Sequence, residues 1–131
     1  MSSLPTETPS FFVLPDLHAL TPFPASFNPH HPVVSAESLA WIASFPNVFL
    51  DAKRAAFTQG VGELLCAHAY PYADRERLRT LCDFIGMLFV IDEISDDQDE
   101  VGARKTGSAL YEVMKNIEYD DGTTLCKMSK E

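Results

Sequence analysis

The chain has 131 residues, 46% of them hydrophobic, and a formal net charge of −9. This length suits one domain or part of one, and the hydrophobic fraction is sufficient for a packed core. The acidity excludes the basic surface that nucleic-acid-binding proteins need, and it disfavours attachment to an anionic membrane through bulk charge. No apolar run approaches the ~20 residues of a membrane-spanning helix, so we expect no membrane insertion.

The cysteines and the start of the chain both favour a cytoplasmic location. Cys66, Cys82 and Cys126 are odd in number and widely spaced, which is typical of reduced thiols rather than of a disulfide framework. The first ten residues, MSSLPTETPS, lack the basic and apolar regions of a secretory signal. We therefore expect a cytoplasmic protein without disulfides.

Prolines dominate the beginning of the chain, where seven of the nine stand within residues 1–34. This spacing excludes a long helix or a central strand. We interpret residues 1–10 as disordered and residues 11–32 as an extended arm, which has too many aromatics for a linker. We expect this arm to lay its apolar side chains over a body formed by the rest of the chain; these are Phe11, Phe12, Leu14, Leu17, Leu20, Phe23 and Phe27.

From Ser35 onward prolines are rare and the apolar residues recur at helical spacing. The stretch SAESLAWIASF predicts a helix that starts with a capping box at Ser35 and ends before Pro46. Further helices are predicted over 50–57, 61–70, 74–96 and 101–118, with Asp74 as an N-cap. A turn at 120–124 then precedes the start of another helix at Leu125. No alternating strand pattern of any length occurs, so the sequence predicts an all-α fold, with one helical domain over 35–131.

The arginines at the start of the long predicted helix, Arg75, Arg77 and Arg79, are weaker functional candidates. They lie about 20 Å or more from Asp92 along the helix, at ~1.5 Å per residue. We therefore expect them to form ion pairs rather than to contact a ligand near Asp92. We likewise expect Trp41 to be a core residue.

The stretch LFVIDEISDDQDEVG, residues 88–102, joins an apolar helical segment to a dense group of acids. Six acidic residues fall within 92–100, and the rest of the chain has a net charge of only −3. Asp92 and Asp96 are four residues apart, so both carboxylates lie on one face of a helix, one turn from each other. Glu93 is rotated from Asp92 by about 100°. These like charges repel each other and oppose the helix dipole, and a divalent cation removes both costs.

Magnesium is the cation that fits this pattern best. Mg²⁺ prefers oxygen ligands, and it typically takes one or two carboxylates together with phosphate oxygens and waters. Asp92, Asp96 and Glu93 are therefore the candidate metal ligands, placed so as to hold a diphosphate above an apolar pocket. Phe89, nearly one turn before Asp92, is the first candidate for the pocket wall; Leu88 and Ile85 are weaker ones.

The motif IDEISDDQD resembles the aspartate-rich D-(D/E)-x-x-D motif of class I terpene synthases. Its surroundings are similar to the fungal, mushroom-type sesquiterpene synthases, in FVLPDL, NPHHPVVSAES followed by Trp41, AYPYADRERLRTLCDF and DGTTLCKMSKE. The similarity covers most of residues 11–131. The resemblance implies Mg²⁺-dependent ionisation of farnesyl diphosphate, or a similar prenyl diphosphate, and cyclisation of the resulting cation within apolar and aromatic walls.

Part of the family pattern has no counterpart in this sequence. An N-D-x-x-S-x-x-x-E type motif, which is the second metal site of the family, does not occur. The resemblance is therefore to the N-terminal portion of the family, and residues 35–131 are interpreted as an incomplete terpene synthase bundle behind the proline-rich arm. We expect a truncated, inactive fragment whose exposed apolar helix faces are covered by association.

Two alternatives to this interpretation stay open. One is a catalytically dead truncated product that binds a prenyl diphosphate or a full-length relative. The other is an unrelated acidic helical interaction protein.

Overall fold

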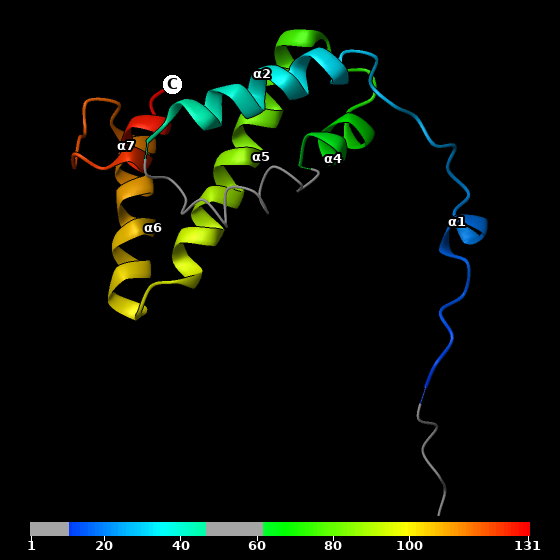
Figure 1. Ribbon diagram of the computed structural model, residues 1–131, viewed down its shortest axis with the longest axis horizontal. Helices are drawn as coiled ribbons and strands as arrows, with labels where there is room; N and C mark the ends of the chain where they lie inside the picture. Colours follow the sequence, from blue (N-terminus) through cyan, green and yellow to red (C-terminus); the bar gives the residue numbers. More distant parts are fainter. Residues whose placement is uncertain (1–10, 47–61) are drawn as a thin grey trace, which may run out of the picture.

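The computed structural model describes residues 11–46 and 62–131. Within these ranges all regular secondary structure is helical, which confirms the all-α prediction. The disorder predicted for residues 1–10 and the helix predicted over 50–57 lie outside the described residues. Figure 1 shows α2 and α4 packed along α5, with α6 beside the far end of α5 and the short α7 next to it. The helices are α1 (Leu17–Leu20), α2 (His31–Ser44), α4 (Gly62–Ala69), α5 (Arg75–Asp96), α6 (Glu100–Lys115) and α7 (Thr124–Met128).

Helix α2 begins four residues before the predicted start at Ser35, so that prediction is wrong. The helix starts at His31, with Pro32 in its first turn. Proline is well suited to this position, because its fixed φ matches the helix and its missing N–H would have had no partner there. The predicted end is confirmed, since α2 stops at Ser44 with Phe45 as its C-cap, directly before Pro46.

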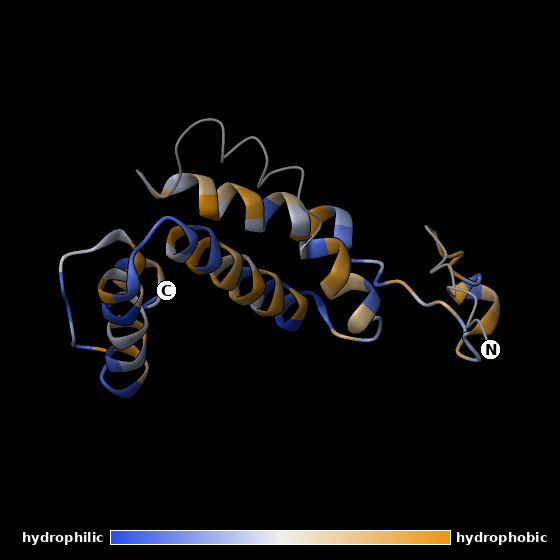
Figure 2. Cartoon of the chain, turned by 90° about the horizontal axis from the view of Figure 1, so that it is seen from below, coloured by the Kyte–Doolittle hydropathy of each residue, from blue (hydrophilic) through white to orange (hydrophobic). Residues whose placement is uncertain are grey.

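Helix α5 is the longest element, and its start agrees with the prediction. Asp74 is the N-cap, and its carboxylate accepts a hydrogen bond from the Arg77 N–H at 2.9 Å. Every fourth residue along one side is buried: Leu78, Cys82, Gly86 and Val90. Figure 2 shows hydrophilic residues at both ends of α5 and apolar residues between them. The buried ladder is therefore the side on which α2 and α4 pack.

Two groups of buried side chains hold these helices together. The first joins α2, α5 and α7 through Ile42, Phe45, Val90 and Met128, with Trp41 packed against it. Trp41 is therefore part of a core, as predicted. The second group joins α2, α4 and α5 and consists of Val34, Cys66, Leu78 and Cys82, with Ala73, Leu81 and Ile85 against it. All three cysteines are free and buried, as expected for reduced thiols.

Asn28 connects the arm to the helical body, and sequence reasoning did not single it out. Its side chain is fully buried, and Nδ2 donates to the carbonyls of Tyr70 and Ala73, each at 2.8 Å. Its Oδ1 accepts from the N–H of His30 at 2.9 Å. Asn28 thereby fixes the start of α2 against the loop between α4 and α5. The Asn-Pro pair in NPHHP was the available signal, because Asn side chains often bond to nearby backbone at turns.

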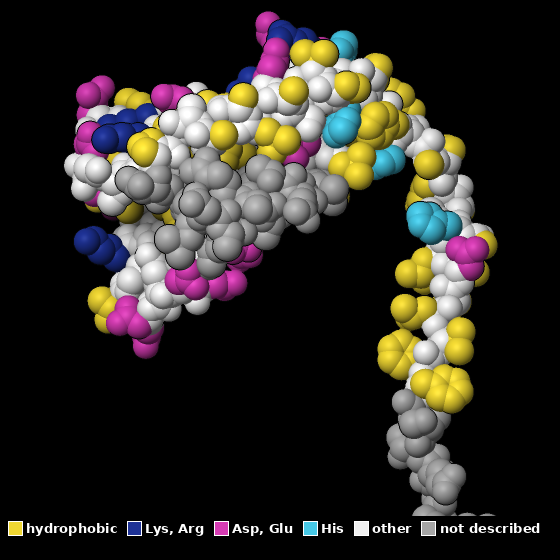
Figure 3. Space-filling view, viewed as in Figure 1, with side chains coloured by type: hydrophobic (Ala, Val, Ile, Leu, Met, Phe, Trp, Pro, Cys, Tyr) yellow, Lys and Arg dark blue, Asp and Glu magenta, His cyan; other side chains and the backbone are white. Residues whose placement is uncertain are grey.

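Most of the arm does not pack on the body, contrary to the prediction. Its apolar side chains from Phe11 to Phe23 are between 61% and 83% exposed, and Figures 1 and 3 show the segment extending away from the helices. Only Phe27 follows the expectation, since its ring lies 5.0 Å from those of His31 and His68. The closely spaced prolines limit regular structure to the four residues of α1. The apolar side chains of the arm from Phe11 to Phe23 therefore do not dock on the body.

The junction between α5 and α6 is tightly built. Asp99 is the N-cap of α6, and its carboxylate accepts from the Gly102 N–H at 2.8 Å. The Thr106 hydroxyl lies 3.0 Å from Oε1 of Gln98, whose side chain packs over Gly102. Helix α6 ends at Lys115, three residues before the predicted end. One acid of the acidic stretch thus serves as a helix cap.

Candidate metal and diphosphate site

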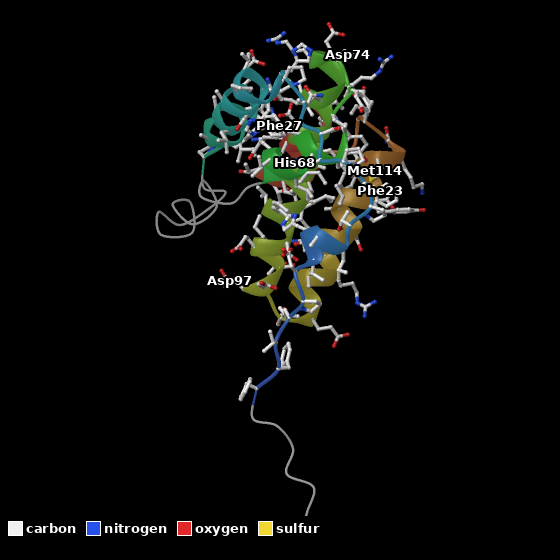
Figure 4. All side chains as sticks on the ribbon, turned by 90° about the vertical axis from the view of Figure 1, so that its right-hand side faces the viewer. Phe23, Phe27, His68, Asp74, Asp97 and Met114 are labelled. Atoms are coloured by element: carbon white, nitrogen blue, oxygen red, sulfur yellow. The ribbon has the colours of Figure 1, made fainter. Side chains whose placement is uncertain are left out.

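Asp92 and Asp96 lie on the last turns of α5, which runs without a break to Asp96. Both residues are exposed. Because the helix is continuous, their four-residue spacing puts both carboxylates on one face, with Cβ atoms about 5–6 Å apart. Figure 3 shows acidic side chains at the tip where α5 ends and α6 begins, and Figure 4 places Asp74 and Asp97 at opposite ends of α5. The acidic end of α5 is therefore open to a cation from solvent.

The donor set matches a hard divalent ion. Each carboxylate supplies oxygen atoms, which Mg²⁺ prefers, and exposure leaves room for the waters and phosphate oxygens that complete its coordination. Glu93, the third predicted ligand, is half-buried. The Ser95 hydroxyl donates to the Asp92 carbonyl at 2.9 Å within this last turn. The three residues thus fit a magnesium ion in chemistry, and their role as ligands stays a prediction.

The three predicted wall residues differ in their surroundings. Leu88 and Phe89 are 37% and 41% exposed, and they precede Asp92 by four and three positions on α5. The Phe89 ring packs against Gly62 of α4, where a Cβ would come within 3.0 Å of it. Ile85 is half-buried and packs against the Cys66–Cys82 core group. Leu88 and Phe89 are therefore available beside the acids, whereas Ile85 already serves the core of this chain.

One cavity among the described residues lies elsewhere on α5. It has a volume of about 390 Å³ and is lined by residues that include Trp41, Asp83, Phe84 and Met87. None of the predicted metal or wall residues contributes to it. The described helices thus supply one wall beside the acidic motif, and this cavity is a separate feature of the described residues.

The arginines at the start of α5 form ion pairs, as predicted. Arg79 Nε lies 2.8 Å from Asp83 Oδ1, and its Nη1 lies 3.7 Å from Glu37. Arg75 pairs with the same Glu37, and Arg77 pairs with its own N-cap, Asp74. The two pairs with Glu37 link α5 to α2 at the end that is remote from the acidic motif. They are partly exposed, so each contributes little to stability.

One further group of possible metal ligands has a structural explanation. Ligand atoms of Asp120, Asp121 and Cys126 lie within 4.8 Å of one another. Asp121 accepts hydrogen bonds from the Thr123 hydroxyl and N–H, which lower the pKa of its carboxyl group. Thr123 in turn caps α7 by accepting from the Cys126 N–H. These contacts build the turn that the sequence predicted at 120–124, and they account for the group.

Comparison with known proteins shows which proteins this chain is related to. No family model matches the chain. The chain is 47% identical over its whole length to the bifunctional terpene synthase Agr4 of Cyclocybe aegerita, of which it covers 37%. It is 33% identical to viridiflorene synthase Agr2 of the same fungus, again over its whole length and 34% of that protein. The chain belongs to the fungal terpene synthase family.

The match covers only part of these relatives. The chain spans about a third of their length, which agrees with the resemblance to an N-terminal portion. A further relative, from Coprinopsis cinerea, is 49% identical over 92% of the chain and is named linoleate 10R-lipoxygenase COP4. That name refers to another reaction. The assignment to terpene synthases follows from Agr4 and Agr2 together with the D-E-x-x-D motif.

Among the described residues, no helix combines the length and the apolar character needed to cross a membrane.

Proposed function

We propose that this chain is the part of a sesquiterpene synthase that carries its first magnesium motif. In the proposed reaction, Asp92 and Asp96, with Glu93 beside them, would hold Mg²⁺, which would supply the positive charge that binds the diphosphate of farnesyl diphosphate. The observation that carries the proposal is the pair of exposed carboxylates on one face of an unbroken α5, directly after an apolar segment. The names of Agr4 and Agr2 support the same reaction class.

The ion would supply Lewis acidity and balance the charge of the leaving diphosphate. The protein's own residues have two tasks in this proposal. The rigid last turns of α5 hold Asp92 and Asp96 in one orientation, so that the diphosphate is bound at a defined place. Leu88 and Phe89 line the side of α5 next to it, and the Phe89 ring face is suited to a passing carbocation. These residues exclude water on one side only.

This one-sided arrangement limits what the 131 residues do alone. Cyclisation requires a carbocation that is enclosed away from water. The cavity lined by Trp41 and Met87 does not include the acidic motif, and the chain spans about a third of its relatives. We therefore propose that cyclisation belongs to a chain of the relatives' length, and that these residues alone bind a metal–diphosphate without converting it. The cytoplasmic location stays a prediction.

The geometry and the comparisons bear differently on the two alternatives, a truncated binding product and an unrelated interaction protein. A truncated product that binds a prenyl diphosphate or a full-length relative uses the same acidic site, so it is compatible with the geometry. An unrelated acidic interaction protein is contradicted by the identity to terpene synthases over the whole chain.

Calorimetric titration of the chain with pyrophosphate tests the proposal. We expect binding that requires Mg²⁺ and that weakens at least about tenfold in Asp92→Asn and in Asp96→Asn, because each change removes one anionic ligand without changing side-chain size. Glu100→Gln is the matched control, since Glu100 belongs to the same acidic stretch but stands on α6. Equal affinity in all four proteins, or no binding by the folded chain, would refute the assignment.

Product analysis tests the second part of the proposal. The chain is incubated with farnesyl diphosphate and Mg²⁺, and the organic extract is analysed by gas chromatography with mass spectrometry. We expect no cyclised product. A cyclic sesquiterpene at a level that depends on Asp92 would show that the 131 residues are sufficient for catalysis.

A further inference from the structure

The last turn of α5, which carries Asp96, is a weak place in its own helix. The final carbonyls of any helix have no partner within it, so its last turn opens easily. No basic residue stands in this turn, and Asp92, Glu93 and Asp96 lie toward the negative end of the helix dipole. Ile94 packs against the first core group, but it stands two residues after Asp92 and so on the opposite side of the helix, at about 100° per residue. A contact beyond Asp96 would therefore steady the face that carries the acids.

Gln98 makes such a contact, two residues after Asp96. Its N–H donates to the Ser95 carbonyl at 3.0 Å, which adds one tight turn to the end of α5. Its side chain lies over Gly102 of α6, where an added Cβ would come within 3.1 Å of the Gln98 Cβ. Its Oε1 accepts a hydrogen bond from the Thr106 hydroxyl at 3.0 Å, which we call the Gln98–Thr106 contact. Both side chains are half-buried, so this bond is partly shielded from water.

Helix α6, which supplies Thr106, is itself attached to the helical body. The short α7 packs beside it (Figure 1). Met128 of α7 is buried in the first core group together with Val90 of α5. The packing thus runs from α5 through α7 to α6, and the Gln98–Thr106 contact joins α6 back to the acidic end of α5. The last turn of α5 is therefore tied to a second helix rather than left as a free end.

We propose that Gln98 and Thr106 are positioning residues for the metal site. Their hydrogen bond holds the last turn of α5 formed, so that the carboxylates of Asp92 and Asp96 stay on one face and are ready for a cation. This inference rests on the proposed function, since Asp92 and Asp96 are the proposed ligands. Neither Gln98 nor Thr106 carries a charge or is a proposed ligand. Neutral replacements of similar size leave the charge of the site unchanged, so a loss of affinity reports the position of the carboxylates.

Amide hydrogen exchange, followed by NMR on the metal-free chain, tests whether the contact holds the end of α5. Thr106→Val removes the hydroxyl and keeps the branched shape, whereas Thr106→Ser keeps the hydroxyl. Thr80→Val is the matched control, because the Thr80 hydroxyl donates to the Glu76 carbonyl at 3.1 Å near the other end of the same helix. We expect the amides of residues 95–98 to exchange at least about threefold faster in Thr106→Val. In Thr106→Ser and Thr80→Val their rates should stay within about twofold of the original.

Calorimetric titration with pyrophosphate in the presence of Mg²⁺ tests whether the contact serves the metal site. We expect the dissociation constant to rise at least about threefold in Thr106→Val and in Gln98→Met, and to stay within about twofold in Thr106→Ser and Thr80→Val. Thr106→Val and Gln98→Met remove the same hydrogen bond. The double variant should therefore bind as the weaker single variant does, within about twofold.

The two measurements separate this inference from the proposed function. Absence of Mg²⁺-dependent pyrophosphate binding by the folded original chain refutes the proposed function, and hydrogen exchange then decides alone whether the contact holds the end of α5. If the original chain binds and Thr106→Val binds equally well, the positioning role is wrong while the proposed function stands. Unchanged exchange at residues 95–98 in Thr106→Val also overturns the role. So does a loss of affinity that Thr80→Val shares, or one that adds up in the double variant, because either shows an effect that does not pass through this contact.

Discussion

Helix α2 packs tightly against α5 at Gly86. The effect of adding a side chain there is expected to change sign with the residue that faces it. A Cβ added to Gly86 would lie 2.5 Å from Cδ1 of Ile42, which is a buried side chain of the first core group. Replacing glycine by alanine within a helix contributes about 1 kcal/mol of stability. Overpacking a core costs about 1–3 kcal/mol. We therefore expect Gly86→Ala to lower the free energy of unfolding by up to about 2 kcal/mol, the difference between these two effects.

Ile42→Val removes the methyl group responsible for the clash, so it provides the decisive background. By itself it costs about 0.5–1.5 kcal/mol, as a small buried deletion. In that background we expect Gly86→Ala to raise the free energy of unfolding by up to about 1 kcal/mol. Gly107→Ala is the control for helix propensity, because nothing lies within 4 Å of its added Cβ.

Urea unfolding followed by circular dichroism measures the free energy of unfolding of all five proteins. If Gly86→Ala stabilises the original chain as much as Gly107→Ala does, α2 does not approach α5 as described. A Gly86→Ala penalty that persists in full in the Ile42→Val background would equally refute the reasoning.

Three further predictions concern buried polar groups. Asn28→Asp leaves the carbonyls of Tyr70 and Ala73 without their donor and places a buried carboxylate against them. We therefore expect a loss of about 2–4 kcal/mol in the free energy of unfolding by urea; a loss below about 0.5 kcal/mol would contradict the role of Asn28. Burial raises the pKa of the Glu63 carboxyl group, so the stability contributed by Glu63 falls as pH rises from its unfolded-state pKa through the raised folded-state pKa. Glu63→Gln should therefore stabilise the chain more at pH 7 than at pH 4, and unfolding curves at the two pH values decide this. Burial also raises the pKa of the Cys66 thiol, and it raises that of the Cys82 thiol to about 12. A thiol reagent whose reaction is followed by absorbance at pH 8 should therefore modify both cysteines only after denaturant unfolds the chain. Rapid modification of the native protein would contradict this prediction.

The acidic motif illustrates how far the sequence alone leads. Periodicity and the Asp74 cap predict an uninterrupted helix through Asp96, and a helix permits only one relation between residues four apart. The shared face of Asp92 and Asp96 was therefore predictable without coordinates. The same local rule anticipated the salt bridges of Arg77 and the turn before α7, because each depends on residues that are neighbours along the chain.

Contacts between distant segments were not predictable in this way. The start of α2 depends on Asn28, which meets carbonyls more than forty residues away. The apolar arm suggested a cover over the body, but composition does not say which surface accepts a side chain, and the structure leaves most of the arm exposed.

Ile85 shows the same division within the site. Its spacing from Asp92 predicts a pocket wall, which stays a prediction, and the packing of α4 and α2 against α5 also brings it against the core group with Cys66 and Cys82. The sequence by itself determined the helices and the residues that share their faces, because backbone hydrogen bonding within a helix is local. Only the tertiary structure decided which of those faces are covered and which stay open, because burial depends on partners that the chain brings from elsewhere.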